Sequence, residues 1–528
     1  MKRTIVVHPF LFAAYCVIGV YAQNTSQVPI TWTFRALLIL FLLTFGLYLS
    51  LLWAWKDVER AGFVSTLFLA WLFMGHVYRL LSGWSPFWRT PIGGWIAFLI
   101  ISVPFGVLAS GWIWKKVANK KTITKFLNTV SVVLLVVPLI TIATVFPQER
   151  SQLQTMRARQ RNAAVPVAAS NHRTPDIYLI ILDGYGRADF LQEMYGYDNS
   201  GFINFLKDTG FYVADHATSN YPQTELSLSS LLNFQYLDDY VAGFGDASGR
   251  GPLRELLQHT NFRRFLENEG YRFVALPSAA LFAQIRDADM YISLNPINLN
   301  EFEGLLVSSS IVGVAVEAGG VNLPVQSYET HRQSILFSLE ALKDVPKLAG
   351  PKFVFAHILS PHPPFIFDRS GNFVPPDYPY SSWDASLFPG SKEQYIRGYT
   401  DQITFVNRKI QDTIQSILNN SVKPPIIIIQ GDHGPGAHYD MLELKDSCLT
   451  ERYSILNAYY FPDGDYESLY PEITPVNSLR VVMNQYFGAS LELLADKNYF
   501  ASWLSPYLFT EVTDKVNLTC NVSVAASP

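Results

Sequence analysis

The sequence has few charged residues and few cysteines. Only 16% of its 528 residues are Asp, Glu, Lys or Arg, whereas 49% are hydrophobic; typical soluble domains carry roughly 25% charged residues. The three cysteines, Cys16, Cys448 and Cys520, are too few for a disulfide scaffold or a cysteine-based zinc site. The positive charges form no long basic tract and the formal net charge is -4, so nothing here indicates nucleic-acid binding. The low charge points instead to membrane segments.

Long apolar stretches are concentrated before residue 150. Each comes close to the ~20 residues that an α-helix needs to cross the hydrocarbon core of a membrane. A buried helical core in a soluble protein would also be apolar, but five such stretches in succession favour a membrane region. We therefore predict a transmembrane region over 1–146 with about five helices, at 5–22, 36–55, 63–81, 95–114 and 126–146.

Basic residues at the ends of these stretches predict the orientation of the chain. They precede the first stretch, follow the second, and cluster between the fourth and the fifth, as Lys2, Arg3, Lys56, Arg60, Lys115, Lys116, Lys120, Lys121 and Lys125. The positive-inside rule places these segments in the cytoplasm; the lysine cluster outweighs the exceptions Arg35, Arg79 and Arg89. Everything after residue 150 then lies on the outer side of the membrane. The same orientation results if residues 1–22 are a signal peptide that is cleaved off. The predicted location is the cell membrane, with several crossings and an extracytoplasmic domain.

The outer side of a membrane permits oxidation of cysteines. Cys448 and Cys520 both fall in the part of the chain that is predicted to lie there. We predict that they pair and tie the C-terminus to the external domain.

A different pattern begins after a polar, irregular juxtamembrane linker, 147–172. From Pro175 onward, short β-rich runs alternate with helical patterns, which is typical of an α/β fold with a mostly parallel central sheet flanked by helices. This predicts a domain over 173–511, followed by a loose tail, 512–528. The predicted strands are 177–182, 271–276, 353–359, 426–430 and 457–461, and the predicted helices include 201–209, 254–269, 328–343, 395–418 and 478–486.

Carboxylates and imidazoles follow three of the most apolar predicted strands. Asp183 follows the strand 177–182, and Asp432 and His433 come soon after the strand 426–430. The strand 353–359 runs through His357, and His362 lies shortly after it. Because ligands bind beyond the carboxyl ends of strands in open α/β sheets, we expect these side chains to meet at one edge. Asp oxygens and His nitrogens are the usual ligands of zinc- or manganese-like ions. Each residue alone is more often a turn or a structural residue, but the combination indicates a metal site.

Thr224 lies where a loop enters a predicted helix, within 219–232. As a simple N-cap, its hydroxyl would accept a hydrogen bond from the first helical turn. Alternatively, its hydroxyl reaches a metal at the helix N-terminus, where both would stabilise an alkoxide and make Thr224 a nucleophile. A phosphate would also be favoured there. The residues alone leave both interpretations open.

The order of these motifs resembles that of the alkaline phosphatase/sulfatase superfamily. The motifs are LDG at 182–184, Thr224 before a helix, PHPPF at 361–365 and GDHG at 431–434. The N-terminal helices followed by an external domain are similar to those of lipoteichoic acid synthases and phosphoethanolamine transferases. The resemblance implies an alkaline-phosphatase-like fold that binds one divalent metal ion, zinc or manganese.

The resemblance also implies roles for individual residues. Thr224 would be the nucleophile that becomes phosphorylated. His357 and His362 would contact the substrate or protonate the leaving group. The metal ligands would be Asp183, Thr224, Asp432 and His433.

Two features differ from particular branches of that superfamily. The lipoteichoic acid and phosphoethanolamine enzymes carry Glu as the first ligand, whereas this chain has Asp183, as sulfatases and phosphodiesterases do. Ordinary sulfatases need a C/S-x-P-S-R motif to make formylglycine, and the sequence has none, which disfavours sulfate-ester hydrolysis by that route. A second metal would need His438 together with His357 or His362, and His438 alone is more often an exposed loop residue.

Three functions fit these residues. The favoured one is a transferase that moves a phosphorylated group, phosphoglycerol- or phosphoethanolamine-like, from a lipid-linked donor to an envelope glycan or lipid through a phosphothreonine intermediate. A phosphoesterase or sulfatase-like hydrolase of the same fold would use water as the acceptor. A non-catalytic membrane protein with a degenerate domain is disfavoured by the intact Asp, Thr, Asp and His set.

Overall fold

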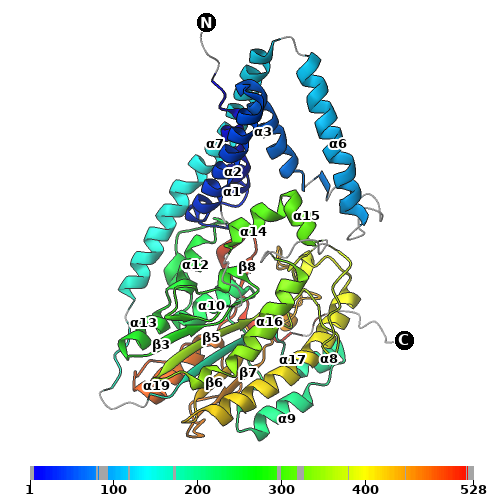
Figure 1. Ribbon diagram of the computed structural model, residues 1–528. Helices are drawn as coiled ribbons and strands as arrows, with labels where there is room; N and C mark the ends of the chain where they lie inside the picture. The colour runs from blue at the N-terminus through cyan, green and yellow to red at the C-terminus, as the bar shows by residue number, and fades with distance from the viewer. Residues whose placement is uncertain are drawn as a thin grey trace. The chain divides into compact units, whose positions relative to one another are not determined.

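The computed structural model describes residues 5–25, 27–75, 77–78, 81, 93–116, 119–163, 165–169, 174–293, 299–317, 326–378, 380–445, 447–518 and 520. The chain forms two compact units (Figure 1). The first, here called the helical unit, comprises Met1–Ser151 and Ile297–Ser327. The second, the α/β unit, comprises Gln152–Pro296 and Tyr328–Pro528.

The five predicted apolar stretches coincide with helices of the helical unit. Among the described residues, three helices are long and apolar enough to cross a membrane, over Ile30–Trp55, Ile96–Lys116 and Lys120–Asn162. Two others have 15 residues each, and the third predicted stretch extends past its helix into positions 76 and 79–80, outside the described residues. The helices are α1 (His8–Ala22), α2 (Thr33–Trp55), α3 (Val58–Leu72), α6 (Gly93–Lys116) and α7 (Lys120–Asn162).

Helix α7 continues past the predicted end of the transmembrane region. It runs unbroken from Lys120 to Asn162, so a boundary at residue 146 falls inside the helix. The polar residues that follow are mostly Gln, Arg, Glu, Ala, Met and Leu, which are good helix formers. The predicted linker, 147–172, is therefore helical over most of its length.

A segment from the middle of the sequence belongs to the helical unit. We call residues 299–317 the returning segment, because residues of the α/β unit precede and follow it. It contains α14 (Glu301–Ser308), which begins with a capping box formed by Asn300 and Glu303, and α15 (Ile311–Glu317). Phe302 is completely buried in an apolar cluster with residues of α1, α2 and α3, and Glu303 pairs with Arg35 of α2. The sequence analysis did not predict this segment.

The α/β unit is built on a sheet that is mostly parallel, as predicted. β1 lies at its centre between β5 and β6, and all three run parallel. β7 is antiparallel to both of its neighbours. In spatial order, the strands within the described residues are β2 (Tyr212–Val213), β7 (Asn457–Tyr460), β6 (Ile426–Gln430), β1 (Ile177–Leu182), β5 (Lys352–Ile358), β3 (Arg272–Ala275) and β4 (Met290–Tyr291).

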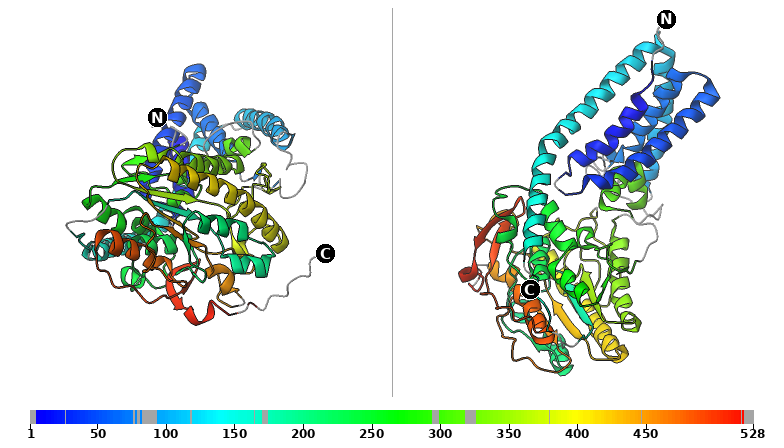
Figure 2. Two further views of the ribbon diagram at one scale, coloured as in Figure 1. Left: turned by 90° about the horizontal axis from the view of Figure 1, so that it is seen from below. Right: turned by 90° about the vertical axis from the view of Figure 1, so that its left-hand side faces the viewer.

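Helices cover both faces of this sheet (Figure 1 and Figure 2). Alternate residues of β1 enter opposite cores, Leu179 on one face and Ile180 on the other. Burial on both faces explains why these strands read as unbroken apolar runs. One core contains α10 (Thr224–Asn233), α12 (Gly251–Gln258), α13 (Asn261–Asn268) and α19 (Pro475–Phe487); the other contains α8 (Ala188–Tyr195), α9 (Ser200–Asp208), α16 (Tyr328–Leu342) and α17 (Lys392–Asn420).

The predicted helix over 254–269 is two helices in the structure. α12 ends at Gln258, and α13 begins at Asn261 after Thr260, whose hydroxyl accepts a hydrogen bond from the backbone N–H of Arg263. The amphipathic pattern continues across the break, so periodicity did not reveal it. Smaller elements that were not predicted from the sequence include β2, β4, α8, α11 (Asp238–Val241), α18 (Leu449–Tyr453) and the hairpin of β8 (Tyr499–Ser502) and β9 (Ser505–Glu511).

The prediction of a loose C-terminal tail is wrong over residues 512–518. Val512 and Val516 are buried in an apolar cluster. Cys520 forms a disulfide with Cys448, as predicted. Residues 519 and 521–528 lie outside the described part of the chain.

Removing this disulfide is expected to destabilise the α/β unit. The bond closes a loop of 72 residues, and native disulfides of this kind contribute about 2–4 kcal/mol. The double variant Cys448→Ser/Cys520→Ser should therefore melt at a lower temperature than the parent, measured on the full chain in detergent. Reductant should lower the melting temperature of the parent and leave that of the double variant unchanged. An equal response of both proteins would contradict the prediction.

Candidate metal centre

The polar residues at the strand ends meet at one edge of the sheet. Asp183 directly follows β1, His357 is the next-to-last residue of β5, and Asp432 and His433 follow β6. Because these strands are parallel neighbours, their carboxyl ends lie together. His357 Nε2 lies 3.2 Å from Asp183 Oδ2, and His433 Nε2 lies 3.5 Å from both Asp183 Oδ1 and Asp432 Oδ2.

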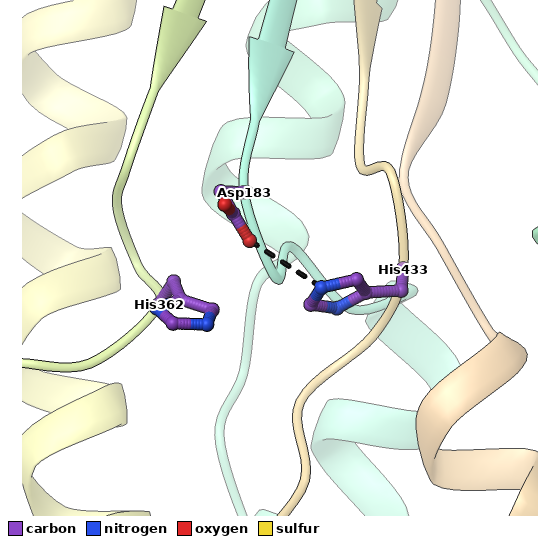
Figure 3. A group of neighbouring side chains, drawn as sticks. All are labelled: Asp183, His362 and His433. Carbon is purple, nitrogen blue, oxygen red and sulfur yellow. Dashed lines mark ion pairs between the residues drawn. The ribbon is translucent and has the colours of Figure 1, made fainter. Parts of the chain in front are cut away.

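Two groups of side chains place possible ligand atoms close to one another. Asp183, His362 and His433 form the first group, which Figure 3 shows converging from three separate strand ends. Asp183, His357 and Asp432 form the second. Within each group the ligand atoms lie within 4.8 Å of one another. Asp183 belongs to both groups and is therefore the centre of the cluster.

Thr224 is the first residue of α10 and does not cap it. The N-cap position is Gln223, and no side chain there bonds to the helix. The Thr224 hydroxyl points into the cluster instead: Oγ1 lies 3.3 Å from His433 Nε2 and 3.5 Å from Asp183 Oδ2. The interpretation of Thr224 as a simple N-cap is therefore excluded.

Buried contacts hold α10 against the cluster. Every residue of this helix is buried. The Ser227 hydroxyl donates a hydrogen bond to the Asp432 carbonyl at 2.7 Å, and Glu225 forms ion pairs with Arg250 and Arg254. A side chain at the start of such a helix has little freedom to leave its position, and such fixed geometry is what a nucleophile requires.

The residues fit a divalent metal ion. Asp183 Oδ1 and Asp432 Oδ2 are buried, and neither accepts a hydrogen bond from any residue that the structure describes. Buried carboxylate oxygens without a partner are costly, and a cation between them would remove that cost. Asp oxygens together with His nitrogens are a donor set that zinc and manganese accept.

The protonation states also fit metal binding. Burial raises the pKa of Asp183, but the combined effect of His362, His357 and His433 is larger and lowers it. The pKa of Asp183 therefore lies well below its usual range. Burial and the nearby Arg452 guanidinium lower the pKa of His433. The carboxylate is therefore ionised and the imidazole neutral, and these are the forms that bind metal.

His357 and His362 face different partners. His357 Nδ1 lies 2.8 Å from Ser278 Oγ, which leaves Nε2 toward Asp183. His362 Nδ1 lies 2.6 Å from the Pro363 carbonyl. Burial lowers the pKa of His362, but the carboxylates of Asp183 and Asp384 raise it more, and the net shift is upward.

Two charged residues of the site, Asp384 and Arg452, were not predicted from the sequence. They are both buried and form an ion pair. Arg452 Nη2 lies 3.2 Å from His433 Nε2, and its Nε donates to the Pro222 carbonyl at 2.8 Å. Neither residue lies in a recognisable motif. For Arg452, the sequence signal is a pair of charged residues, Glu451 and Arg452, within the otherwise largely apolar run 448–461.

His438, the candidate for a second metal site, lies outside both groups. Its backbone N–H donates to Glu451 Oε2 at 2.7 Å, and its Nδ1 lies 3.4 Å from Glu451 Oε1. Among the described residues, no group of possible ligands contains His438.

A family model described as sulfatase matches residues 175–481. The chain belongs to the sulfatase family. The match covers the strands and loops that carry the metal centre and confirms the alkaline phosphatase/sulfatase resemblance. The sulfatase-family domain makes this chain a sulfatase-like hydrolase or transferase. No curated protein sequence matches the chain.

Solved structures similar to this chain include a periplasmic domain, the soluble domain of a phosphoethanolamine transferase and a putative sulfatase. The C-terminal periplasmic domain of EptC from Escherichia coli, in complex with Zn, is 11% identical, with a TM-score of 0.44 over 67% of this chain and 98% of that one. The soluble domain of lipooligosaccharide phosphoethanolamine transferase A from Neisseria meningitidis is 10% identical (TM-score 0.37, 60% and 89% covered). The putative sulfatase yidJ from Bacteroides fragilis is 13% identical (TM-score 0.36, 64% and 83% covered).

Proposed function

We propose that this protein transfers a phosphorylated group from a lipid-linked donor to an envelope glycan or lipid, through a phosphothreonine at Thr224. The group would resemble phosphoglycerol or phosphoethanolamine. The observation that carries the proposal is the position of the Thr224 hydroxyl, which faces Asp183 and His433 and not its own helix. Membership of the sulfatase family, without a C/S-x-P-S-R motif in the sequence, supports threonine as the nucleophile.

The first half of the reaction moves the group from the donor to the enzyme. Thr224 Oγ1 attacks phosphorus and forms a P–O bond, and its proton is released to water. The bond from phosphorus to the donor oxygen breaks, and that oxygen takes the electron pair and a proton from His362. The carboxylates of Asp183 and Asp384 raise the pKa of His362, which favours the protonated form that this role requires.

Asp183, Asp432 and His433, together with the Thr224 hydroxyl, would hold the divalent ion. When bound, such an ion supplies Lewis-acid polarisation of the phosphoryl oxygens. The N-terminus of α10 favours the phosphate independently, because its first backbone N–H groups carry partial positive charge.

The second half moves the group to the acceptor. A hydroxyl oxygen of the acceptor attacks phosphorus, and the P–Oγ1 bond of Thr224 breaks. His362, now neutral, takes the proton of that hydroxyl, while Thr224 Oγ1 regains a proton from water. Water in place of the acceptor would give the hydrolase, the second candidate, which the aspartate at position 183 favours.

Product analysis with and without an acceptor distinguishes the two candidates. We expect the phosphorylated group to appear on a glycan or lipid acceptor, with slow release to water when the acceptor is omitted. Mass spectrometry of quenched enzyme should find an adduct on the peptide that contains Thr224, and the mass of the adduct would name the group. Release to water at an unchanged rate, with no transfer, would favour the hydrolase.

We propose that the α/β unit is the catalytic domain and lies outside the membrane. The returning segment supports this, because the chain on both sides of it belongs to the α/β unit. It contacts the end of α1, the start of α2, the residues just after α3 and the start of α6, at Tyr21, Arg35, Gly75 and Phe98. Helix ends that share one contact segment share one side of the membrane. Arg35, an exception to the charge rule, has Glu303 as its partner.

Cysteine labelling tests this orientation. Val422 is 97% exposed in the α/β unit, and Asn119 lies between α6 and α7. A membrane-impermeant maleimide should label Val422→Cys on intact cells and label Asn119→Cys only after permeabilisation. The native cysteines give little background, because Cys448 and Cys520 are paired and Cys16 is buried. The reverse pattern would overturn the orientation.

A further inference from the structure

The guanidinium of Arg250 contacts the residues on both sides of Thr224. Its Nη1 donates a hydrogen bond to Glu225 Oε2 at 2.5 Å, and its Nη2 donates to Gln223 Oε1 at 2.7 Å. The side chains of Arg250 and Glu225 are 1% and 3% exposed, so this ion pair is shielded from water. Thr224, between the two contacted residues, faces the metal centre instead.

The position of the Thr224 hydroxyl depends on the backbone of these two neighbours. Gln223, the N-cap, has an extended backbone, and α10 begins with the next residue. The Gln223 side chain makes no capping hydrogen bond to the helix. It is used instead by Arg250 and by the Ala501 carbonyl, to which its Nε2 donates at 2.7 Å. A tilt of this first helical turn would therefore carry Thr224 Oγ1 away from the metal centre.

Arg250 is itself fixed by a second group of contacts. Its Nη2 also donates to the Trp503 carbonyl at 2.9 Å, and its guanidinium carbon lies 3.8 Å from the centroid of the Trp503 ring. Trp503, between β8 and β9, donates its backbone N–H to the Met441 carbonyl at 2.8 Å. An indole ring that stacks on a guanidinium is attracted to it and restricts the plane of the donors.

The arrangement of partners requires an arginine. A guanidinium presents its N–H groups in a rigid planar fork, whereas a lysine ammonium is a single point of charge. Charge balance alone would not require Arg250, because Arg254 Nε also donates to Glu225 Oε1, at 3.1 Å. The contact with the uncharged Gln223 therefore serves geometry.

We propose that Arg250 is a positioning residue for the nucleophile. It holds the first turn of α10 so that the Thr224 hydroxyl stays aligned with the metal centre and with the phosphorus of the donor. The proposal rests on the role of Thr224 proposed above. Arg250 does not contact the substrate, and its effect reaches the reaction only through Gln223 and Glu225.

Arg250→Lys keeps the positive charge and removes the fork. The full chain in detergent micelles is assayed with phosphatidylethanolamine and phosphatidylglycerol as donors. A displacement of about 1 Å can cost about 100-fold in rate, so we expect kcat per bound metal ion to fall about 10- to 100-fold. The donor KM and the metal content should stay at the parent values. In a single turnover, the adduct on the Thr224 peptide should form more slowly by the same factor.

Gln223→Met tests the same contact from the other side and leaves the buried ion pair of Arg250 and Glu225 in place. It should lower kcat per bound metal ion about tenfold, for the same geometric reason. In the double variant Arg250→Lys/Gln223→Met, kcat should fall by much less than the product of the two single losses, because both changes break one shared contact. A residue that contributes only to stability would show no such coupling in kcat.

Arg254→Lys is the matched control. It changes the other arginine that pairs with Glu225 and leaves the contact between Arg250 and Gln223 intact. Its kcat should stay near the parent value. A loss equal to that of Arg250→Lys would show that the charge beside Glu225 matters and the fork does not, which would overturn the proposal.

The remaining outcomes separate this proposal from the function on which it rests. Parent kcat in Arg250→Lys, even with a lower melting temperature, would make Arg250 a structural residue and overturn the proposal. Loss of metal in that variant would also overturn it, since Arg250 would then help to build the metal centre. If Arg250→Lys does not fold, parent kcat in Gln223→Met overturns the proposal by itself. A parent enzyme that forms no adduct on Thr224 would overturn the proposed function, and this proposal with it.

Discussion

Replacing Thr224 with alanine is expected to abolish turnover while the protein stays folded and retains its metal. Three protein ligands, Asp183, Asp432 and His433, remain without the hydroxyl. The covalent step, however, is lost, so that kcat should fall by at least about 10³-fold. The variant removes no cap, because the N-cap of α10 is Gln223. The measurements are turnover with a lipid-linked donor, metal content of the purified protein, and the mass of the peptide that contains Thr224.

Thr260→Ala is the matched control for this experiment. Its hydroxyl does cap a helix, by accepting a hydrogen bond from the Arg263 N–H. Its loss should cost about 1 kcal/mol of stability and leave turnover near the parent value. If Thr224→Ala behaves like Thr260→Ala, the nucleophile assignment fails, and the proposed mechanism fails with it.

Asp432→Asn is expected to lose metal and activity together. The substitution removes one of the two buried carboxylates whose free oxygens flank His433 Nε2. Metal affinity should fall by at least about 100-fold, more than the 10- to 100-fold typical for the loss of an outer-shell partner. In the parent, added metal should raise the melting temperature by mass action. In the variant, the same concentration should leave the melting temperature unchanged.

Asp246→Asn, an exposed carboxylate, controls for the loss of one negative charge and should behave like the parent. A full complement of metal in Asp432→Asn would remove Asp432 from the ligand set. If the Asp432→Asn variant holds its full metal content but does not turn over, Asp432 takes part in the reaction in another way than by binding the metal.

The part of the site that the sequence predicts is the part built on strand ends. Asp183, Asp432 and His433 each follow an apolar strand directly, and parallel strands bring their carboxyl ends together. Because these residues follow the strands so closely in the sequence, their common position at one edge of the sheet could be predicted. Asp384 and Arg452 lie in a loop and a five-residue helix, and their pairing spans 68 positions. No local pattern predicts such a contact, since it depends on how the loops pack.

The helical unit shows the same division. The apolar stretches located its helices, because hydropathy over about 20 residues is a local property. Their ends were less predictable. α7 extends through polar residues to Asn162 because those residues favour a helix. The packing of 299–317 with α1 and α2 depends on contacts such as Phe302 with Tyr21, more than 250 positions apart, which no periodicity reveals.

The returning segment means that a single cut cannot separate this protein into two self-sufficient halves. A soluble fragment that begins at residue 174 would carry Phe302 and Ile311 without the helices that bury them, and such exposed apolar surface promotes aggregation. A fragment that ends at residue 163 would lack Glu303, the partner of Arg35. Expression of the isolated α/β unit should therefore benefit from replacing 299–317 with a polar linker. Expression of the isolated N-terminal helices should benefit from supplying that segment in trans.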